Sequence, residues 1–421
     1  MQEEDIKIYK ILKIILEYAI YKSASDIHFD CEEDKIIVRY RINHILQHIL
    51  ELEKKYLKSL ARVIQFCLEN KEMISELVCE GRFKFAPTGN PASIINCIVV
   101  IRKTSQGKKI VITLHNKKSQ ARDLRQLGIP SQTLSKIYPY LNPDATQNHA
   151  QNGTILLTSP AGEGLSTSFY SMLSYLESPF KNIASLEYLI ECDLPHINQS
   201  QIEVRQGFNF QNGIRAILRQ DPDMIGVAEV RNKTEMKLLL ESTIDRNLTI
   251  ACLSAQSTIS ALSLLADMEL PLYLIADAIN LIINQRLLRR ICPHCIERTK
   301  LTKDEIKKIL INYDADYLLK LMQEHNIVSK IYKDFFKLEF YRGAGCVRCG
   351  QSGYLGEIGI FEILELNDEI RKIIKTKGFT KHSIAKIIEK IDKQNNLSLI
   401  ADAFMKAKNG ITSIEEVLRI I

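Results

Sequence analysis

The chain has 421 residues, of which 46% are hydrophobic and 25% are charged, a balance typical of globular proteins with several buried cores. Its 56 basic and 50 acidic residues leave a net charge of +6, too small an excess to predict nucleic-acid binding. The apolar runs are far shorter than a membrane span, and the N-terminal segment lacks the uncharged core of a cleavable signal. We therefore expect a cytoplasmic chain, docked on a membrane machine if it meets a membrane at all.

Residues 1–120 are predicted to form a small α+β domain. Apolar residues recur at helical spacing in the first part, and short alternating runs follow. The expected elements are an amphipathic helix over 1–22, strands over 25–29, 35–42, 94–101 and 109–114, and a helix over 57–70.

Residues 121–285 are predicted to form a P-loop α/β domain with a parallel central sheet. A helical stretch over 121–141 comes first. An apolar strand over 154–158 then leads through a glycine-containing loop into a helix over 166–176, the opening unit of such a domain. Further elements are expected as strands over 183–186, 224–228 and 248–253 and a helix over 233–242.

Residues 286–361 contain the strongest local signal, the pairs Cys292-Pro-His-Cys295 and Cys346-Val-Arg-Cys349. Two such pairs supply four thiolates, the tetrahedral set that Zn²⁺ prefers. One alternative is two chance pairs of buried cysteines. A second alternative is a redox dithiol, which would account for only one of the two pairs. The sequence therefore predicts a structural zinc site in this region.

The rest of the C-terminal part is predicted to be helical. Residues 300–337 are expected to form helices that bulge out from the cysteine pairs. Residues 362–421 are expected to form a C-terminal helical region, with Asn367 capping one helix and Thr412 with Glu415 forming a capping box for the last.

The predicted phosphate loop, Ser159–Ser166, departs from the pattern GxxxxGK[ST]. Such a loop binds phosphate through backbone amides and a helix N-terminus, and its lysine contacts the β and γ phosphates. Gly162, Gly164, Ser166 and Thr167 are the candidate nucleotide-binding residues.

The loop has lost its first glycine and its lysine. Ser159 and Leu165 stand at these positions, and Glu163 adds a carboxylate where phosphates would lie. On this pattern alone, an ordinary glycine turn into a helix is the alternative interpretation.

Short sequence blocks along the chain resemble, in order, those of the type II secretion system protein E and type IV pilus assembly ATPase family. They include ASDIH, VRYRI, the RQDPD block, a Walker B segment, QRL followed by CxxC, and a closing GITS-EEVL. The blocks lie at 24–28, 38–42, 207–223, 225–231, 285–295, 353–360 and 410–418.

This resemblance implies a RecA-like second domain, a hexameric assembly and the use of ATP with Mg²⁺. It also implies catalytic roles for Glu191 and Glu229, one activating water and the other linked to Mg²⁺. The candidate arginines are Arg215, Arg219 and Arg231, for which ordinary salt bridges are the alternative.

Departures from the family pattern lie outside the loop as well. The family has an acidic segment that corresponds to residues 186–191, and Tyr188 replaces its aspartate. Asn232 replaces the aspartate after the Walker B arginine. The family also has a histidine segment that corresponds to residues 246–257, and both of its histidines are lost, to Asn247 and Ser254. We expect all of these changes to weaken the nucleotide site.

The sequence therefore predicts a motor-family protein with a weak or inactive nucleotide site. It would act as partner, scaffold or regulator in a homo-hexamer or in a mixed oligomer with an active paralogue, on inner-membrane platform proteins. The alternative is an active hexameric ATPase that powers pilus or pseudopilus assembly. No nucleic-acid partner is expected.

Overall fold

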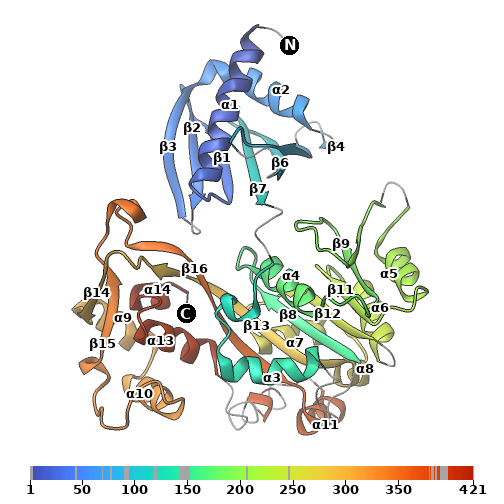
Figure 1. Cartoon of the computed structure of the whole chain (residues 1–421), viewed down its shortest axis with the longest axis vertical. Coiled ribbons are helices and arrows are strands. Elements are labelled where there is room, and N and C mark those ends of the chain that lie inside the picture. The colour runs from blue at the N-terminus through green and yellow to red at the C-terminus, as the bar shows by residue number, and fades with distance from the viewer. Residues whose placement is uncertain are drawn as a thin grey trace. The chain divides into compact units, whose positions relative to one another are not determined.

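The computed structural model describes residues 3–42, 45–68, 70–75, 78–89, 94–116, 121–142, 152–204, 207–244, 247–378, 380, 384, 386–388 and 397–420. The chain divides into two compact units, coloured along the chain in Figure 1: Met1–Gln120 with the short segment Glu191–Asp193, and the remainder of the chain. Among the helices in these ranges, none combines the length and apolar character that crossing a membrane requires.

The first unit contains a sheet whose described strands run in the order β3-β2-β1-β7-β6-β5-β4, with every neighbouring pair antiparallel. Its apolar positions alternate, so that Ile27 and Phe29 of β1 lie in the core. The strands are β1 Asp26–Cys31, β2 Lys35–Ile42, β3 Ile45–Glu53, β4 Asn70–Ser75, β5 Val78–Phe85, β6 Ile95–Thr104 and β7 Gly107–Asn116.

Two helices pack on this sheet, α1 (Glu3–Tyr21) and α2 (Leu57–Cys67). The predicted N-terminal amphipathic helix is confirmed, and Figure 1 shows α1 lying against the strands of this sheet. The Tyr40 hydroxyl donates a hydrogen bond to the Ile15 carbonyl at 2.6 Å, and burial raises the pKa of Tyr40. The expectation that the second helix continues to residue 70 is wrong, because the chain turns extended at Leu68 and continues into β4.

The second unit contains a sheet of order β10-β9-β11-β12-β8-β13-β16 among the described strands. The predicted parallel sheet is confirmed, since only the pairing of β13 with β16 is antiparallel. Every residue of β8 is buried, as in a strand covered on both faces. The strands are β8 Gly153–Ser159, β9 Ile183–Glu187, β10 Asn198–Gln201, β11 Met224–Val227, β12 Leu248–Ser254, β13 Ile279–Ile291 and β16 Tyr354–Glu365.

Helices connect these strands, and the helical stretch expected over 121–141 is present but interrupted. A short 3-10 turn ends at Gly128, whose φ of 92° is left-handed, and α3 begins only after Pro130. The helices are η2 Leu124–Leu127, α3 Ser131–Leu141, α4 Leu165–Leu176, α5 Phe210–Leu218, α6 Lys233–Thr243, α7 Thr258–Asp267, α8 Leu272–Ala278 and α11 Asp368–Lys377.

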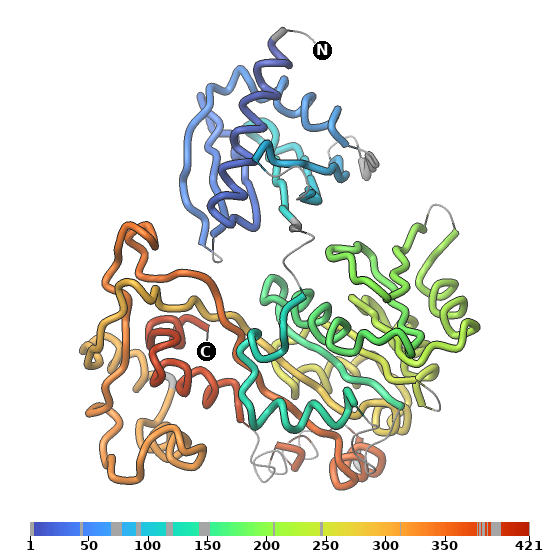
Figure 2. The backbone as a smooth tube through the Cα atoms, viewed as in Figure 1, coloured from blue at the N-terminus to red at the C-terminus, as the bar shows by residue number. Residues whose placement is uncertain are grey.

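Residues 286–361 do not leave the main sheet entirely, because β13 runs past residue 285 and β16 runs past residue 361. Between them, β14 (Ile296–Lys300) and β15 (Glu339–Gly343) form an antiparallel ribbon. Figure 2 shows this orange segment beside the red C-terminal helices, with which it shares an apolar core. The helices here are α9 Lys303–Asn312, α10 Ala315–Glu324, η5 Phe335–Lys337, η6 Val347–Cys349, α13 Leu399–Lys408 and α14 Ile414–Ile420.

Three expectations for the C-terminal part have clear outcomes. Asn367 does cap α11, accepting the Ile370 amide at 3.0 Å. The capping box of Thr412 with Glu415 is wrong, because Ser413 accepts the Glu416 amide and the Thr412 hydroxyl bonds the Arg289 carbonyl instead. Residues 300–337 are helical only in part, since the chain is irregular between α10 and η5.

A buried ion pair lies within α13, and its carboxylate connects this helix to β16. Lys406 Nζ lies 2.6 Å from the Asp402 carboxylate, and the two side chains are only 4% and 0% exposed. Asp402 also accepts the Phe361 amide of β16 at 2.8 Å. Burial acts to raise the pKa of Asp402 and to lower that of Lys406, so each charge depends on the other.

We predict that Lys406→Met lowers the stability of the second unit by about 3–5 kcal/mol, because it leaves a buried carboxylate without its cation. Urea unfolding followed by circular dichroism measures this loss. The matched control is Lys237→Met, which breaks the exposed i,i+4 pair with Glu241 and should change stability by about 0.5 kcal/mol or less. Equal losses in the two variants would contradict the assignment.

Candidate functional site

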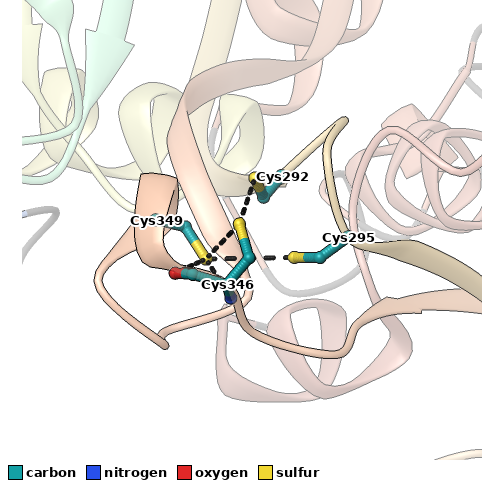
Figure 3. Close-up of side chains that lie close together, drawn as sticks. All are labelled: Cys292, Cys295, Cys346 and Cys349. Atoms are coloured by element: carbon teal, nitrogen blue, oxygen red, sulfur yellow. Dashed lines mark hydrogen bonds between the residues drawn. The ribbon is translucent and has the colours of Figure 1, made fainter.

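The four cysteines of the predicted metal site come together in the structure. Cys292 follows the last residue of β13 and Cys295 precedes β14, whereas Cys346 precedes the short helix η6 and Cys349 is its last residue. Figure 3 shows their sulfur atoms turned toward one another from these two turns.

Sulfur–sulfur distances in the cluster match those of a tetrahedral zinc site. Cys292 Sγ lies 3.8 Å from Cys346 Sγ, Cys295 Sγ lies 3.9 Å from Cys349 Sγ, and the sulfurs of Cys346 and Cys349 are 3.6 Å apart. All four lie within 4.8 Å of one another. Zinc at about 2.3 Å from each of four sulfurs requires sulfur–sulfur distances of about 3.8 Å. The residues present therefore fit a zinc ion.

Two glycines allow the cysteine turns to meet. A Cβ on Gly343 would lie 2.0 Å from the Gly353 carbonyl oxygen, so no larger residue fits without moving the backbone. That same carbonyl accepts the Cys292 amide at 2.9 Å. The close approach of Gly343 and Gly353 thus brings the second cysteine pair to the end of β13.

The surroundings shift the pKa values of two of the cysteines in opposite directions. Burial acts to raise the pKa of Cys349, but amide hydrogen bonds from Cys346 and Gly353, at 3.2 and 3.3 Å, outweigh it and lower this pKa to about 6. Burial raises the pKa of Cys295 to about 12. Without a metal, the cysteines therefore do not all ionise near neutral pH, and binding of zinc would release protons.

The predicted phosphate loop joins β8 to α4, as expected. Gly162 and Gly164 have φ angles of 82° and 77°, a left-handed region that favours glycine. The Ser168 amide donates to the Gly164 carbonyl at 3.2 Å, which closes the first turn of α4. Leu165, at the lysine position, is the first residue of that helix, followed by Ser166 and Thr167. The backbone thus has the form of a phosphate loop, but Leu165 stands where such a loop has its cationic lysine.

Strand β13 holds this loop from one side. The Gln285 amide group donates to the Glu163 carbonyl at 2.6 Å and accepts the Ser168 hydroxyl at 2.5 Å. The Glu163 carboxylate accepts the Leu287 amide at 2.6 Å. The sequence patterns singled out Glu163 only as a charge, and its contact with β13 was not predicted.

A second group missed by sequence reasoning is Glu187, the last residue of β9, which is fully buried. The Tyr170 hydroxyl of α4 donates to its carboxylate, as do Ser185 Oγ at 2.5 Å and Gln199 Nε2 at 3.0 Å. This network links the phosphate-loop helix to the end of β9. The acidic segment in the sequence contained Glu187, but only burial identifies it as structural.

The candidate catalytic carboxylates lie beyond the ends of the neighbouring strands β9 and β11. Glu191 is four residues past β9 and Glu229 is two residues past β11, while β12 separates β11 from the loop strand β8. Glu229 is exposed, and its carboxylate lies 2.8 Å from an Arg231 guanidinium nitrogen.

Tyr188, at the position of the family aspartate, contacts this pair. The Arg231 guanidinium lies 3.4 Å from the centre of the Tyr188 ring, and the Tyr188 hydroxyl donates to Glu235 at 2.7 Å. Burial and the Glu235 carboxylate raise the pKa of Tyr188. Arg231 therefore has two partners within its own neighbourhood, in agreement with the salt-bridge alternative for this residue.

The other candidate residues of the site are spread over the second unit. Arg215 in α5 and Arg219 at its C-terminal end are exposed. Ser254 pairs directly with Ser159 across β12 and β8, so it lies beside the first residue of the loop. Asn247 precedes β12, at the end of the strand opposite to Ser254, so it does not lie beside the loop.

Comparisons with known proteins agree with this architecture. A sequence profile described as Type II/IV secretion system protein matches residues 1–419. The chain is 28% identical to the type II secretion system ATPase E of Vibrio cholerae over 418 residues, which cover 99% of this chain and 76% of that protein. It is 29% identical to the type IV pilus assembly ATPase PilB of Thermus thermophilus over 412 residues, which cover 97% of this chain and 42% of that protein.

Solved structures show the same fold. The ATPase DotB of Legionella pneumophila superposes with a TM-score of 0.64 at 18% identity, covering 97% of this chain and 95% of that one. The pilus retraction motor PilT with bound ADP gives a TM-score of 0.59 at 18% identity, covering 97% of this chain and 96% of that one. Since the family profile spans nearly all of its residues, the chain belongs to the Type II/IV secretion system protein family.

Proposed function

We propose that this chain is a motor-family subunit of a type II secretion or type IV pilus assembly machine whose nucleotide site is degenerate. In this proposal it acts as a partner, scaffold or regulator beside an active paralogue. The observation that carries the proposal is Leu165, an apolar side chain at the start of α4 where the family has its phosphate-binding lysine.

The size of the lost interaction supports a weak site. A lysine about 4 Å from a phosphate contributes about 4 kcal/mol at an effective dielectric constant of about 20. Phosphoryl transfer depends mainly on positioning and on neutralising charge, so this loss affects hydrolysis more than binding. Ser254, beside the loop, supplies no imidazole to replace the lost donor.

The rival proposal is an active hexameric ATPase. Its support is the retained loop backbone, the Ser166 hydroxyl position and Glu229 beyond β11, together with relatives named as ATPases. This rival needs a cation at the phosphates from another source, such as a neighbouring subunit.

Assembly and location follow from the same proposal. We place the chain in a homo-hexamer or a mixed oligomer on the cytoplasmic side of an inner-membrane platform, with no nucleic-acid partner. We retain the division into 1–120, 121–285, 286–361 and 362–421 as a functional one, in which the third region is the zinc-binding part.

We also propose that the cysteine cluster holds one structural Zn²⁺. Four thiolates fill a tetrahedral shell and leave no open position for substrate or water. When bound, the ion would fix the turn after β13 to the turn before β16, while His294 remains outside the shell and lies 2.9 Å from an Arg348 guanidinium nitrogen.

We predict that the purified protein releases phosphate from ATP no faster than a Glu229→Gln variant does. Leu165→Lys should raise affinity for a fluorescent ATP analogue by at least roughly tenfold because it restores the missing charge, with solvent screening keeping the gain below the full Coulomb value of about 4 kcal/mol, and it should not restore full turnover. Leu165→Met is the matched control, since it changes shape but adds no charge. Wild-type turnover that disappears in Glu229→Gln would overturn the degenerate-site proposal and favour the rival.

We predict one zinc ion per chain by elemental mass spectrometry of the purified protein. Cys295→Ser should lose most of the metal and expose β14 and β15 to proteolysis, because zinc binding and folding of such a site are coupled. Cys67→Ser, which alters a half-buried cysteine of the first unit outside the cluster, should keep the metal. Metal-free wild-type protein with an intact ribbon would contradict the proposal.

A further inference from the structure

The phosphate loop contains an acidic residue whose side chain does not extend freely into solvent. Glu163 is half-buried, and its carboxylate accepts the Leu287 amide of β13 at 2.6 Å. Its own carbonyl accepts the Gln285 side chain at 2.6 Å. Glu163 is therefore fixed to β13 by both its backbone and its side chain.

These contacts keep a negative charge within the loop. The described ion pairs of the second unit do not include Glu163, so no salt bridge offsets the charge there. A hydrogen bond from one neutral amide orients a carboxylate but leaves its net charge in place. Any phosphate bound to the loop amides would meet this charge a few residues away.

The same contacts hold the loop in shape. A Cβ on Gly164 would lie 3.1 Å from Leu287 Cδ1, so the Leu287 side chain covers this glycine while the Leu287 amide bonds Glu163. Gln285 extends the attachment to the first turn of α4 through Ser168. In nucleotide-binding loops, the bound phosphate accepts hydrogen bonds from the loop amides, whereas the contacts from β13 bind the Glu163 carbonyl and carboxylate.

We propose that Glu163 is a specificity-determining residue that excludes polyphosphate anions from the loop and, through its bond to β13, holds the loop in shape without them. The inference rests on the proposed function only in taking Ser159–Ser166 as the phosphate site. It goes further in assigning weak phosphate binding, which the proposed function expects, to a charge that is present as well as to the lysine that is missing.

Two substitutions separate the charge from the hydrogen bond. Glu163→Gln keeps a side-chain oxygen for the Leu287 amide but removes the charge. Glu163→Asp keeps the charge but is one methylene too short for the contact. Glu177→Gln is the matched control, because it removes the same charge at the far end of α4, about 18 Å away and beyond the Debye length.

The probe is inorganic pyrophosphate, titrated by isothermal calorimetry at about 0.1 M salt, where the Debye length is about 10 Å. We expect Glu163→Gln to bind it roughly tenfold more tightly than the wild type, and the gain to shrink as salt is raised. Glu163→Asp and Glu177→Gln should bind it as the wild type does. An unchanged affinity in Glu163→Gln, or an equal gain in Glu177→Gln, would overturn the assignment of the charge.

Hydrogen exchange measured by mass spectrometry on peptides from β13 tests the second part of the proposal, that the bond from Glu163 to β13 holds the loop in shape. Glu163→Asp should exchange the Leu287 amide at least several-fold faster than the wild type, and Glu163→Gln should stay close to it. Equal protection of the Leu287 amide in all variants would overturn this second part. ATP turnover by the wild type would refute the proposed function alone, since the pyrophosphate comparison does not depend on hydrolysis.

Discussion

Strand β13 is the element on which both candidate sites depend. Its first half pairs with β8, the strand that enters the phosphate loop, and nearly its whole length pairs with β16. Gln285 and Leu287, in its middle, hold the loop, and Cys292 follows its last residue. Because β13 is paired with β8 up to Asn284 and with β16 up to Ile291, one continuous strand connects the loop to the cysteine cluster within this unit.

The charged groups around the predicted phosphate loop are arranged unfavourably for binding phosphate. Leu165 removes the cation, and Glu163 supplies a carboxylate that is held in place. Arg231, a cation beyond β11, is engaged by the Tyr188 ring and the Glu229 carboxylate. The backbone of a phosphate loop is preserved, since this form also serves the fold: it connects β8 to α4, whose apolar side chains lie in the core.

Much of the fold was predictable from the sequence, because apolar periodicity reports which face of an element is buried. The strand before the phosphate loop, the helix after it and the cysteine cluster were expected and are present. The sequence did not predict the interactions between distant segments, because such interactions leave no local pattern. Thr412 bonds Arg289 instead of capping a helix, and Asn247 lies at the edge of the sheet opposite the loop although it is only seven residues from Ser254.

The central claim is that the phosphate loop keeps its shape without a bound nucleotide and does not bind one. Hydrogen exchange of the amides in Gly162–Ser168, with and without millimolar Mg-ATP, tests it most directly. The account predicts that these amides exchange at the same rate in both conditions, because the loop has no cation to hold the phosphates and a carboxylate that repels them. Strong protection of these amides by Mg-ATP, accompanied by the appearance of ADP, would contradict it.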